Sequence, residues 1–303
     1  MTGVQRRLLG WYGKHGRASL PWRARRSPYR TVVSEFMLAQ TQVDRVVPRF
    51  QAFTEAFPDF AALARASVAA VLRQWKGLGY NTRAVRLQRL AQALVERHGG
   101  ALPMQREALQ ALPGIGPYIA AAIRAFAFDI DDAPVDTNVR RVVHRLCYGV
   151  EHPARADARE LDARARALVP AGRGHDWSSA LMDLGATICT ARAPECALCP
   201  MRSDCVAAPI DWAELENARK TARKRRPPQE ALPFKRTVRY ARGRIVDRLR
   251  DLPAGERISL RALHRAVSPL IPERDINEVR AFVAALERDG LVTRDGDGVA
   301  LRE

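Results

Sequence analysis

Residues 189–205 read CTARAPECALCPMRSDC and carry four of the chain's five cysteines. Intervals of six, two and five residues separate Cys189, Cys196, Cys199 and Cys205. Four thiolates at such spacing can bind either a zinc ion or a cubane iron–sulfur cluster. Zinc sites usually pair two short Cys-x2–4-Cys knuckles, and only one interval here is that short. The remaining cysteine, Cys147 in RLCYG, stands apart and is expected to be an ordinary buried thiol.

The composition is that of a globular and strongly basic chain. Hydrophobic residues make up 47% and charged residues 27% of its 303 residues, which is typical of a soluble protein with two or three domains. The formal net charge of +17 favours a polyanionic partner, and nucleic acid is the commonest one. Heavy use of arginine by the host is one alternative. An anionic membrane surface is another, but it would need an amphipathic or lipid-anchored segment.

The sequence contains no recognisable signal for secretion or membrane insertion. There is no run of about eighteen apolar residues, and residues 1–16 lack a long apolar core. A cytoplasmic protein without membrane attachment is therefore expected. Cysteines clustered in one segment make a poor disulfide framework, and they fit a protein of a reducing compartment.

Helical periodicity dominates the first 206 residues. Apolar side chains recur at three- and four-residue spacing in residues 32–53, 60–75, 82–99 and 118–128. Glycine-containing turns punctuate these stretches, and no alternating strand pattern of useful length occurs before residue 285. The pattern predicts an all-α fold for this part of the chain.

The C-terminal third has a different composition. Six Lys or Arg residues lie between 219 and 226 and are followed by Pro227-Pro228, which predicts a basic linker over residues 207–232. This linker could be a DNA-gripping arm or a solvated tether. Beyond it, helical stretches at 238–250, 259–267 and 274–288 precede an Asp-Gly hairpin signal in LVTRDGDGVALRE at 291–303. Three helices followed by a hairpin is the order of a winged helix, which could bind DNA or pack on its neighbour.

The segment LPGIG at 112–116 lies between two helical stretches. Glycines allow a tight turn and a close approach of the backbone to a ligand. Backbone N–H groups at a helix N-terminus bind anions. Gly114, Ile115 and Gly116 are therefore expected to bind a DNA phosphate.

Two carboxylates are candidates for catalysis. Glu35 lies in a mostly apolar helical stripe within VVSEFMLAQ, where desolvation would raise its pKa and suit a general acid. Asp136 in PVDTNVRRV could open a helix, and its alternative role is that of an N-terminal cap. Such a pair meets the demands of glycosidic bond hydrolysis, in which one group protonates the leaving base and the other acts at the sugar.

Several of these segments together resemble the MutY-type adenine DNA glycosylases of the helix-hairpin-helix, iron–sulfur superfamily. The matching segments are LPWR at 20–23, SPYRTVVSEFMLAQTQV at 27–43, WKGLGY at 75–80, LPGIGPY at 112–118, PVDTNVRRV at 134–142, LMDLGA at 181–186 and the cysteine loop. The resemblance implies a [4Fe–4S] cluster on Cys189, Cys196, Cys199 and Cys205, which would act as a DNA-facing structural staple.

The resemblance also implies a two-lobed all-α fold with a cluster loop and a small winged-helix-like domain. One lobe, residues 1–25 and 131–206, would carry the cluster. The other, residues 26–130, would be a six-helix barrel with the helix-hairpin-helix, and the substrate base would flip into the cleft between the lobes. The partner would be double-stranded DNA containing a mismatch, bound by a monomer associated with the nucleoid.

Catalytic roles follow from the same resemblance. Glu35 would protonate the adenine, and Asp136 would be the nucleophile or the electrostatic partner at the sugar. Asn138 and Tyr118 would order this nucleophile and the transition state. Endonuclease III-like relatives carry a Schiff-base lysine where Tyr118 stands, so the resemblance implies a monofunctional glycosylase that leaves the strand intact.

Binding roles follow in the same way. Trp22, Arg23 and Asp183 would line the pocket for the flipped base. Gln40 and Tyr80 would enter the DNA stack and probe the base opposite the adenine.

The chain departs from the family pattern at several positions. Ala39 replaces a frequent glutamine, Asn81 follows Tyr80 where a second tyrosine is frequent, and Thr137 replaces a frequent glycine. Residues 233–303 take the place of the larger Nudix-like domain that reads 8-oxoguanine in well-known members, although compact members also exist.

Two other functions are open at this stage. A thymine or uracil glycosylase acting on T:G or U:G mismatches shares many of these motifs, but that branch tends to carry arginines where this chain has Gln40-Thr41-Gln42. A non-catalytic iron–sulfur DNA-binding regulator is the second alternative. The presence of Glu35, Asp136 and Tyr118 argues against it.

Overall fold

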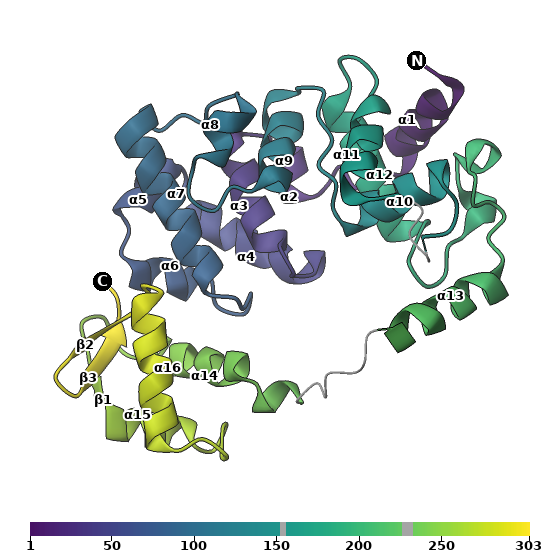
Figure 1. Ribbon diagram of the computed structural model, residues 1–303. Coiled ribbons are helices and arrows are strands. Elements are labelled where there is room, and N and C mark those ends of the chain that lie inside the picture. The colour runs from purple at the N-terminus through teal and green to yellow at the C-terminus, as the bar shows by residue number, and fades with distance from the viewer. Residues whose placement is uncertain (152–155, 226–232) are drawn as a thin grey trace. The chain divides into compact units, whose positions relative to one another are not determined.

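The computed structural model describes all residues except 152–155 and 226–232, and the chain divides into two compact units (Figure 1). Unit 1 comprises Met1–Val32, Met104–Ala111 and Ile115–Pro228. Unit 2 comprises Val33–Pro103, Leu112–Gly114 and Gln229–Glu303. Helix α3, Pro28–Leu38, begins in unit 1 and ends in unit 2.

Unit 1 is helical throughout its described residues. Its elements are α1 (Gly3–His15), α2 (Pro21–Ala24), α8 (Arg106–Gln110), α9 (Pro117–Phe128), α10 (Thr137–Cys147), α11 (Ala158–Ala167), α12 (Gly174–Thr187), the 3-10 helices η1 (Cys196–Leu198) and η2 (Arg202–Asp204), and α13 (Trp212–Arg225). Helix α12 packs against α1, α9 and α10, and α11 packs against α10.

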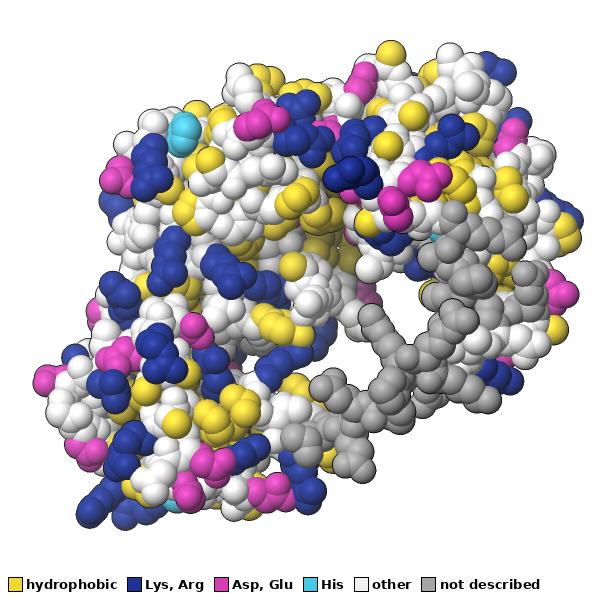
Figure 2. Space-filling model, in the orientation of Figure 1, with side chains coloured by type: hydrophobic (Ala, Val, Ile, Leu, Met, Phe, Trp, Pro, Cys, Tyr) yellow, Lys and Arg dark blue, Asp and Glu magenta, His cyan; other side chains and the backbone are white. Residues whose placement is uncertain are grey.

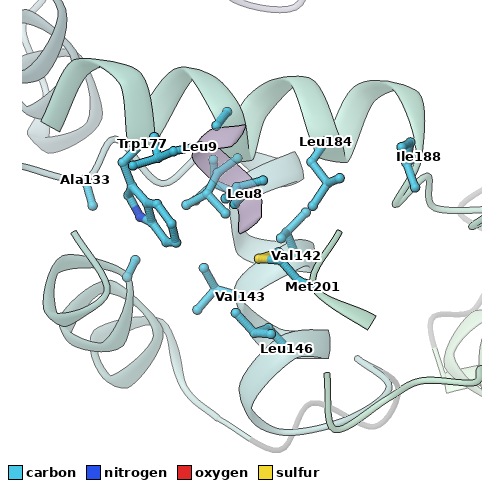
Figure 3. Packing of buried hydrophobic residues seen from close by; sticks show 14 of the residues in the cluster. Leu8, Leu9, Ala133, Val142, Val143, Leu146, Trp177, Leu184, Ile188 and Met201 are labelled. Carbon is cyan, nitrogen blue, oxygen red and sulfur yellow. The ribbon is translucent and has the colours of Figure 1, made fainter. Parts of the chain in front are cut away.

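The core of unit 1 joins the chain's N-terminus to the cysteine loop. Leu8 on α1 and Trp177 on α12 are fully buried and lie in one cluster with Val142 and Leu146 of α10 (Figure 3). Met201, between Cys199 and Cys205, packs in the same cluster. Burial of this apolar surface therefore fixes the loop on α10 and α12.

Unit 2 combines a helical part with the C-terminal module, which we define as residues 233–303. The helices of the first part are α4 (Val43–Ala56), α5 (Phe60–Arg65), α6 (Val68–Gln74) and α7 (Thr82–His98). The elements of the C-terminal module are η3 (Phe234–Arg236), α14 (Val238–Arg250), β1 (Ile258–Ser259), α15 (Leu260–Val267), α16 (Ile276–Arg288), β2 (Val292–Asp295) and β3 (Gly298–Leu301).

The C-terminal module has the element order expected for a winged helix. The predicted helices and hairpin are present, and the strands form an antiparallel sheet in the order β1-β3-β2. Val292 pairs with Leu301, and Ile258 pairs with Val299. The sequence does not reveal β1, because a strand of two residues is too short to show alternation.

Two stretches predicted as helix are each interrupted. Between α3 and α4, Gln40 adopts a left-handed backbone with φ 64°. Between α5 and α6, the Ser67 side chain caps α6 by accepting a hydrogen bond of 3.2 Å from the Ala70 amide. Apolar periodicity reports only which face is buried, so it does not detect a turn that keeps that face inward.

The segment predicted as a linker contains α13. Its residues, AELENARK and those that follow, are mostly good helix formers. Leu215 buries against Val150, Ala207 and Ile210, which anchors the start of this helix in unit 1. The pair Pro227-Pro228 lies outside the described residues.

The all-α class is confirmed, since strands in the described chain occur only in the C-terminal module. Among the described helices, none is both long and apolar enough to span a membrane.

Candidate active site and cysteine loop

Asp136 is the N-terminal cap of α10. Its Oδ1 atom accepts a hydrogen bond of 2.7 Å from the Val139 amide, and its Oδ2 atom accepts one of 3.1 Å from the Asn138 side-chain amide. The positive end of the helix dipole lies at this point and favours a negative charge. The capping role is therefore observed, and it leaves the half-buried carboxylate with a fixed orientation.

Arg141 connects this carboxylate to the cysteine loop. Its Nη2 atom donates to Oδ1 of Asn138 at 2.9 Å and to the carbonyl of Gly185 at 2.6 Å. Its Nε atom donates to the Cys189 carbonyl at 2.8 Å. Because Arg141 binds the oxygen of the Asn138 amide, the nitrogen of that amide must face Asp136.

Gly185 permits the close packing that this connection needs. A Cβ atom added at Gly185 on α12 would lie 2.8 Å from Cβ of Asn138 and 3.3 Å from the nearer Val142 methyl group. Only glycine therefore allows α12 to approach the start of α10 so closely.

Arg145, on the next turn of α10, contacts the same loop. Its side chain is 1% exposed and forms two 2.7 Å hydrogen bonds with the Glu151 carboxylate. Its Nη1 atom donates to the Thr190 carbonyl at 2.8 Å and approaches Cys189 Sγ at 3.6 Å. Cys205 Sγ in turn donates to the Arg145 carbonyl at 3.3 Å. Arg145 thus contacts both ends of the cysteine loop, the first through its buried guanidinium and the second through its main-chain carbonyl.

The four clustered cysteines are partly buried, and none forms a disulfide. Burial raises the pKa of the Cys199 thiol to about 11, and the charges of Cys189, Cys205 and Cys196 raise it further. No three His, Cys, Asp or Glu side chains in the described residues are arranged as metal ligands. The donor set of four clustered thiols suits a thiolate-bound metal group.

Arg23 and Asp183, two of the residues expected at the base pocket, form an ion pair. Arg23 Nη1 lies 2.7 Å from Asp183 Oδ2, and Arg17 Nη2 lies 2.7 Å from Oδ1. Burial would raise the pKa of Asp183, but the hydrogen bond and charge of Arg23, followed by those of Arg17, lower it. Asp183 is fully buried, so it holds the two arginines in place. Trp22 precedes Arg23 on α2 and is half-buried.

Glu35 lies on α3 and is 8% exposed. Thr31 and Val32, which lie one turn earlier on the same face of the helix, are also buried. Glu35 belongs to unit 2, whereas Asp136 belongs to unit 1. Tyr118, the second residue of α9, is half-buried and also belongs to unit 1.

Gln40 and Tyr80 share an unusual backbone conformation. Only three non-glycine residues in the described chain have positive φ, and two of them are Gln40 at 64° and Tyr80 at 46°. Each such residue costs of order 1–3 kcal/mol and persists only where surrounding contacts impose it, often at functional sites. These are the two residues that the family resemblance predicts to enter the DNA stack.

Arg83 on α7 imposes these two turns. Its Nη1 atom donates to the carbonyls of Phe36 at 2.8 Å and Met37 at 2.9 Å and also to that of Ala39. Its Nη2 atom donates to Thr41 Oγ1 and to the carbonyls of Leu78 and Gly79 at 2.9, 3.0 and 3.2 Å. Burial lowers the pKa of Arg83 to about 10, so the guanidinium stays charged at neutral pH. One cation thereby joins the segment around Gln40 to the segment before Tyr80.

The segment LPGIG at 112–116 forms the turn between α8 and α9. Gly114 has φ 80°, and an added Cβ would lie 3.1 Å from the Phe36 ring. Gly116 is the N-cap residue of α9, and Pro117 follows as its first residue. The exposed Gly114 and Gly116 flank Ile115, which is 5% exposed.

Sequence reasoning missed Arg83, Arg141 and Arg145. The pattern offered one signal, since Asn138 and Arg141 stand three residues apart on a predicted helix and would face the same side. Most of the carbonyl partners of these arginines lie more than 40 residues away in the sequence, so nothing local marks them.

The chain has clear relatives among known proteins. A family model described as HhH-GPD superfamily base excision DNA repair protein matches residues 33–170. An adenine DNA glycosylase of Mycolicibacterium smegmatis is 39% identical over 292 residues, covering 96% of this chain and 93% of the relative. The relative of the same name from Mycobacterium tuberculosis is 39% identical over 295 residues, covering 96% and 90%. Coverage this high includes most of the C-terminal module.

Solved structures show the same fold. A thermostable thymine-DNA glycosylase superposes with a TM-score of 0.61 at 29% identity, covering 70% of this chain and 95% of that one. An endonuclease III in a non-covalent DNA complex superposes with a TM-score of 0.57, covering 74% and 100%. The identity with the second is 21%, so that likeness concerns the fold alone.

Proposed function

Because the chain belongs to the adenine DNA glycosylase family, we propose that it removes adenine mispaired with 8-oxoguanine or guanine in double-stranded DNA during base excision repair. The observation that carries this proposal is the match of 39% identity over almost the whole chain, C-terminal module included. We propose further that it acts as a monomer.

Asp136 acts at the sugar. Hydrolysis of the N-glycosidic bond passes through an oxocarbenium-like state, which a carboxylate stabilises or attacks. Both oxygens of Asp136 accept hydrogen bonds, from the Val139 amide and from Asn138, and Arg141 fixes the orientation of Asn138. These contacts support a carboxylate of fixed orientation that needs no reorientation during the reaction.

Glu35 donates a proton to the departing adenine. A general acid must keep its proton until the base leaves, and burial in an apolar environment favours the neutral form of a carboxyl group. Its exposed fraction of 8% supports this role. With Tyr118 where the lyase branch carries lysine, no Schiff base forms, and the product is an abasic site in an intact strand.

Cys189, Cys196, Cys199 and Cys205 bind a [4Fe–4S] cluster. When bound, the cluster supplies a rigid cross-link of the loop and no reaction chemistry. Arg141 and Arg145 on α10 contact this loop, which supports a role of the cluster in keeping the start of α10, with Asp136 and Asn138, rigid.

A thymine glycosylase is the second candidate, because the thymine-DNA glycosylase fold superposes on 70% of this chain at 29% identity. To decide, purified protein is incubated with duplexes containing A opposite 8-oxoguanine, A opposite G, T opposite G or U opposite G, and then treated with hot alkali. We expect cleavage at A alone and none before alkali. Cleavage at T or U would support the second candidate, and no cleavage in any duplex would exclude both.

Glu35→Gln tests the acid. We expect base release to stop while binding to the A-containing duplex remains, because the amide keeps the size of the side chain and loses its proton. Single-turnover kinetics and a binding titration on the same duplex measure both. A variant that retains activity would remove Glu35 from this role.

A further inference from the structure

Tyr80 contacts the C-terminal module. The Cζ atom of Arg239, the second residue of α14, lies 3.6 Å from the centroid of the Tyr80 ring, and its Nη1 atom donates a hydrogen bond to the Tyr80 hydroxyl. On the α7 side, Arg83 lies 5.5 Å from the same centroid. A guanidinium at these distances is attracted by the face of an aromatic ring. The strained residue expected to enter the DNA stack therefore lies against two cations.

The C-terminal module, with α14, is held against the preceding helical part of unit 2. Arg250 at its C-terminal end is buried and donates to Oδ1 of Asn81 at 2.6 Å. Lys76 pairs with Asp251 at 3.2 Å, and the Ala69 amide donates to the Arg302 carbonyl at 2.7 Å. Asn81, which departs from the family pattern, is thus an anchor for the C-terminal module. Arg239 therefore belongs to a folded domain that is anchored on residues 69–81.

Aromatic rings and arginines continue outward from Tyr80. Arg239 lies 5.4 Å from the Phe234 ring, which packs edge-on against Tyr240 at 5.4 Å between centroids. Phe234 is 58% exposed. Exposed aromatic rings interleaved with arginines are typical of surfaces on which nucleic-acid bases stack. In Figure 2, Lys and Arg side chains are spread over the visible face of unit 2.

We propose that Arg239 is a positioning residue that holds the Tyr80 ring for insertion beside the base opposite the adenine. The C-terminal module thereby takes part in discriminating between opposite bases. This inference rests on the proposed function, in which Tyr80 probes that base. Arg239 acts through Tyr80 and makes no contact with the reacting atoms.

The full-length protein tests this with Arg239→Ala and Arg239→Lys. Single-turnover rates are measured on A opposite 8-oxoguanine, G and C. A duplex with 2-aminopurine next to the opposite base reports unstacking by its fluorescence. We expect Arg239→Ala to reduce the rate ratio between 8-oxoguanine and C on the order of tenfold, and to weaken the fluorescence rise on binding. Arg239→Lys, which keeps the charge but loses the planar contact, should fall between.

Arg265→Ala is the matched control. It removes one exposed arginine from α15 of the same module and should leave both readouts unchanged. In a Tyr80→Ala background, Arg239→Ala should have no further effect. The inference is overturned if Arg239→Ala discriminates like the wild type, or if its effect persists undiminished without Tyr80. If the wild type releases no adenine, the proposed function fails, and the fluorescence still decides whether Arg239 holds Tyr80 in the DNA.

Discussion

Arginine side chains hold the candidate functional residues in place. Arg83 and Arg141 each donate to main-chain carbonyls of two segments, and Arg145 donates to the Thr190 carbonyl and the Glu151 carboxylate. A guanidinium can do this because its five N–H donors lie in one plane, which a lysine ammonium does not offer. The orientation of Asp136 and the turn before Tyr80 therefore depend on cations that also bind main-chain segments far away in the sequence.

Arg141→Met should lower catalysis without loss of DNA binding. The substitution frees the Asn138 amide to rotate and leaves Asp136 with one fixed hydrogen bond. Displacement of a catalytic group by about 1 Å can cost 10²-fold, so we expect a decrease on the order of 10- to 100-fold in the single-turnover rate. Rate and affinity are measured on the same A-containing duplex.

Arg140→Met is the control for this change. Its side chain is 42% exposed and lies 3.7 Å from Asp162, an ion pair of little energetic value. Its rate should stay within about twofold of the wild type. Equal losses in both variants would mean that the contact of Arg141 with Asn138 has no special part in catalysis.

Asp183 makes stability depend on pH in a predictable direction. The pKa of this buried carboxyl is lowered below its ordinary value of 3.8, so its stabilising effect is present above that value and is lost as the pH falls through the folded-state pKa. Asp183→Asn should reduce the free energy of unfolding by about 3 kcal/mol at neutral pH, because Arg17 and Arg23 lose their buried partner. Denaturant unfolding at several pH values should show this difference shrinking below pH 3.8.

Asp129→Asn provides the comparison. Its ion pair with Arg26 joins side chains that are 57% and 39% exposed, and such pairs contribute about 0–1 kcal/mol. If the loss of unfolding free energy in Asp183→Asn did not depend on pH, Asp183 would not be an ion-paired carboxylate with a lowered pKa.

Among the elements, the packing of α12 on α10 is the most sensitive to substitution. Gly185→Ala places a methyl group 2.8 Å from Cβ of Asn138, so α10 must shift at the turn that carries Asp136. We expect a loss of about 1–3 kcal/mol in unfolding free energy, with a fall in the rate of base release. Gly10→Ala on α1 meets no atom within 4 Å and should instead stabilise the protein by up to about 1 kcal/mol. Thermal unfolding of the two variants distinguishes them, and equal effects would exclude the steric explanation.

Elements that bury one continuous face could be predicted from the sequence. The helices of both units and the hairpin of the C-terminal module follow from apolar periodicity and turn residues. The breaks at Gln40 and Ser67 could not, because the chain turns there without exposing its apolar face. Helix α13 was obscured by its basic composition, which is compatible with both a tether and a helix.

The candidate site likewise has some features that the sequence predicts and others that it does not. The burial of Glu35 was predictable, since a carboxylate among apolar helix positions has no solvated face. The cap at Asp136 was predictable as one of its two roles. The contact between Arg239 and Tyr80 was not, because it joins residues 159 positions apart and depends on how α14 packs on α6.

Across the whole molecule, positive charge greatly exceeds what the ion pairs use. The chain carries 50 Lys and Arg residues against 33 Asp and Glu. Some of the paired arginines, such as Arg145 and Arg250, are buried and serve the fold. The surplus is therefore left to the exposed surface, where it attracts a polyanion before any specific contact forms.

Binding to DNA should accordingly weaken steeply with salt. Each phosphate neutralised by Lys or Arg releases condensed counterions and contributes about −0.9 to the slope of log K against log salt. For roughly six to ten such contacts, we expect the affinity for a duplex to fall about 10³- to 10⁵-fold between 50 and 200 mM salt. Fluorescence anisotropy with mismatched and fully paired duplexes measures the two slopes, which should be nearly equal because phosphate contacts are independent of sequence. A flat response would mean that the arginine-rich surfaces do not face the DNA.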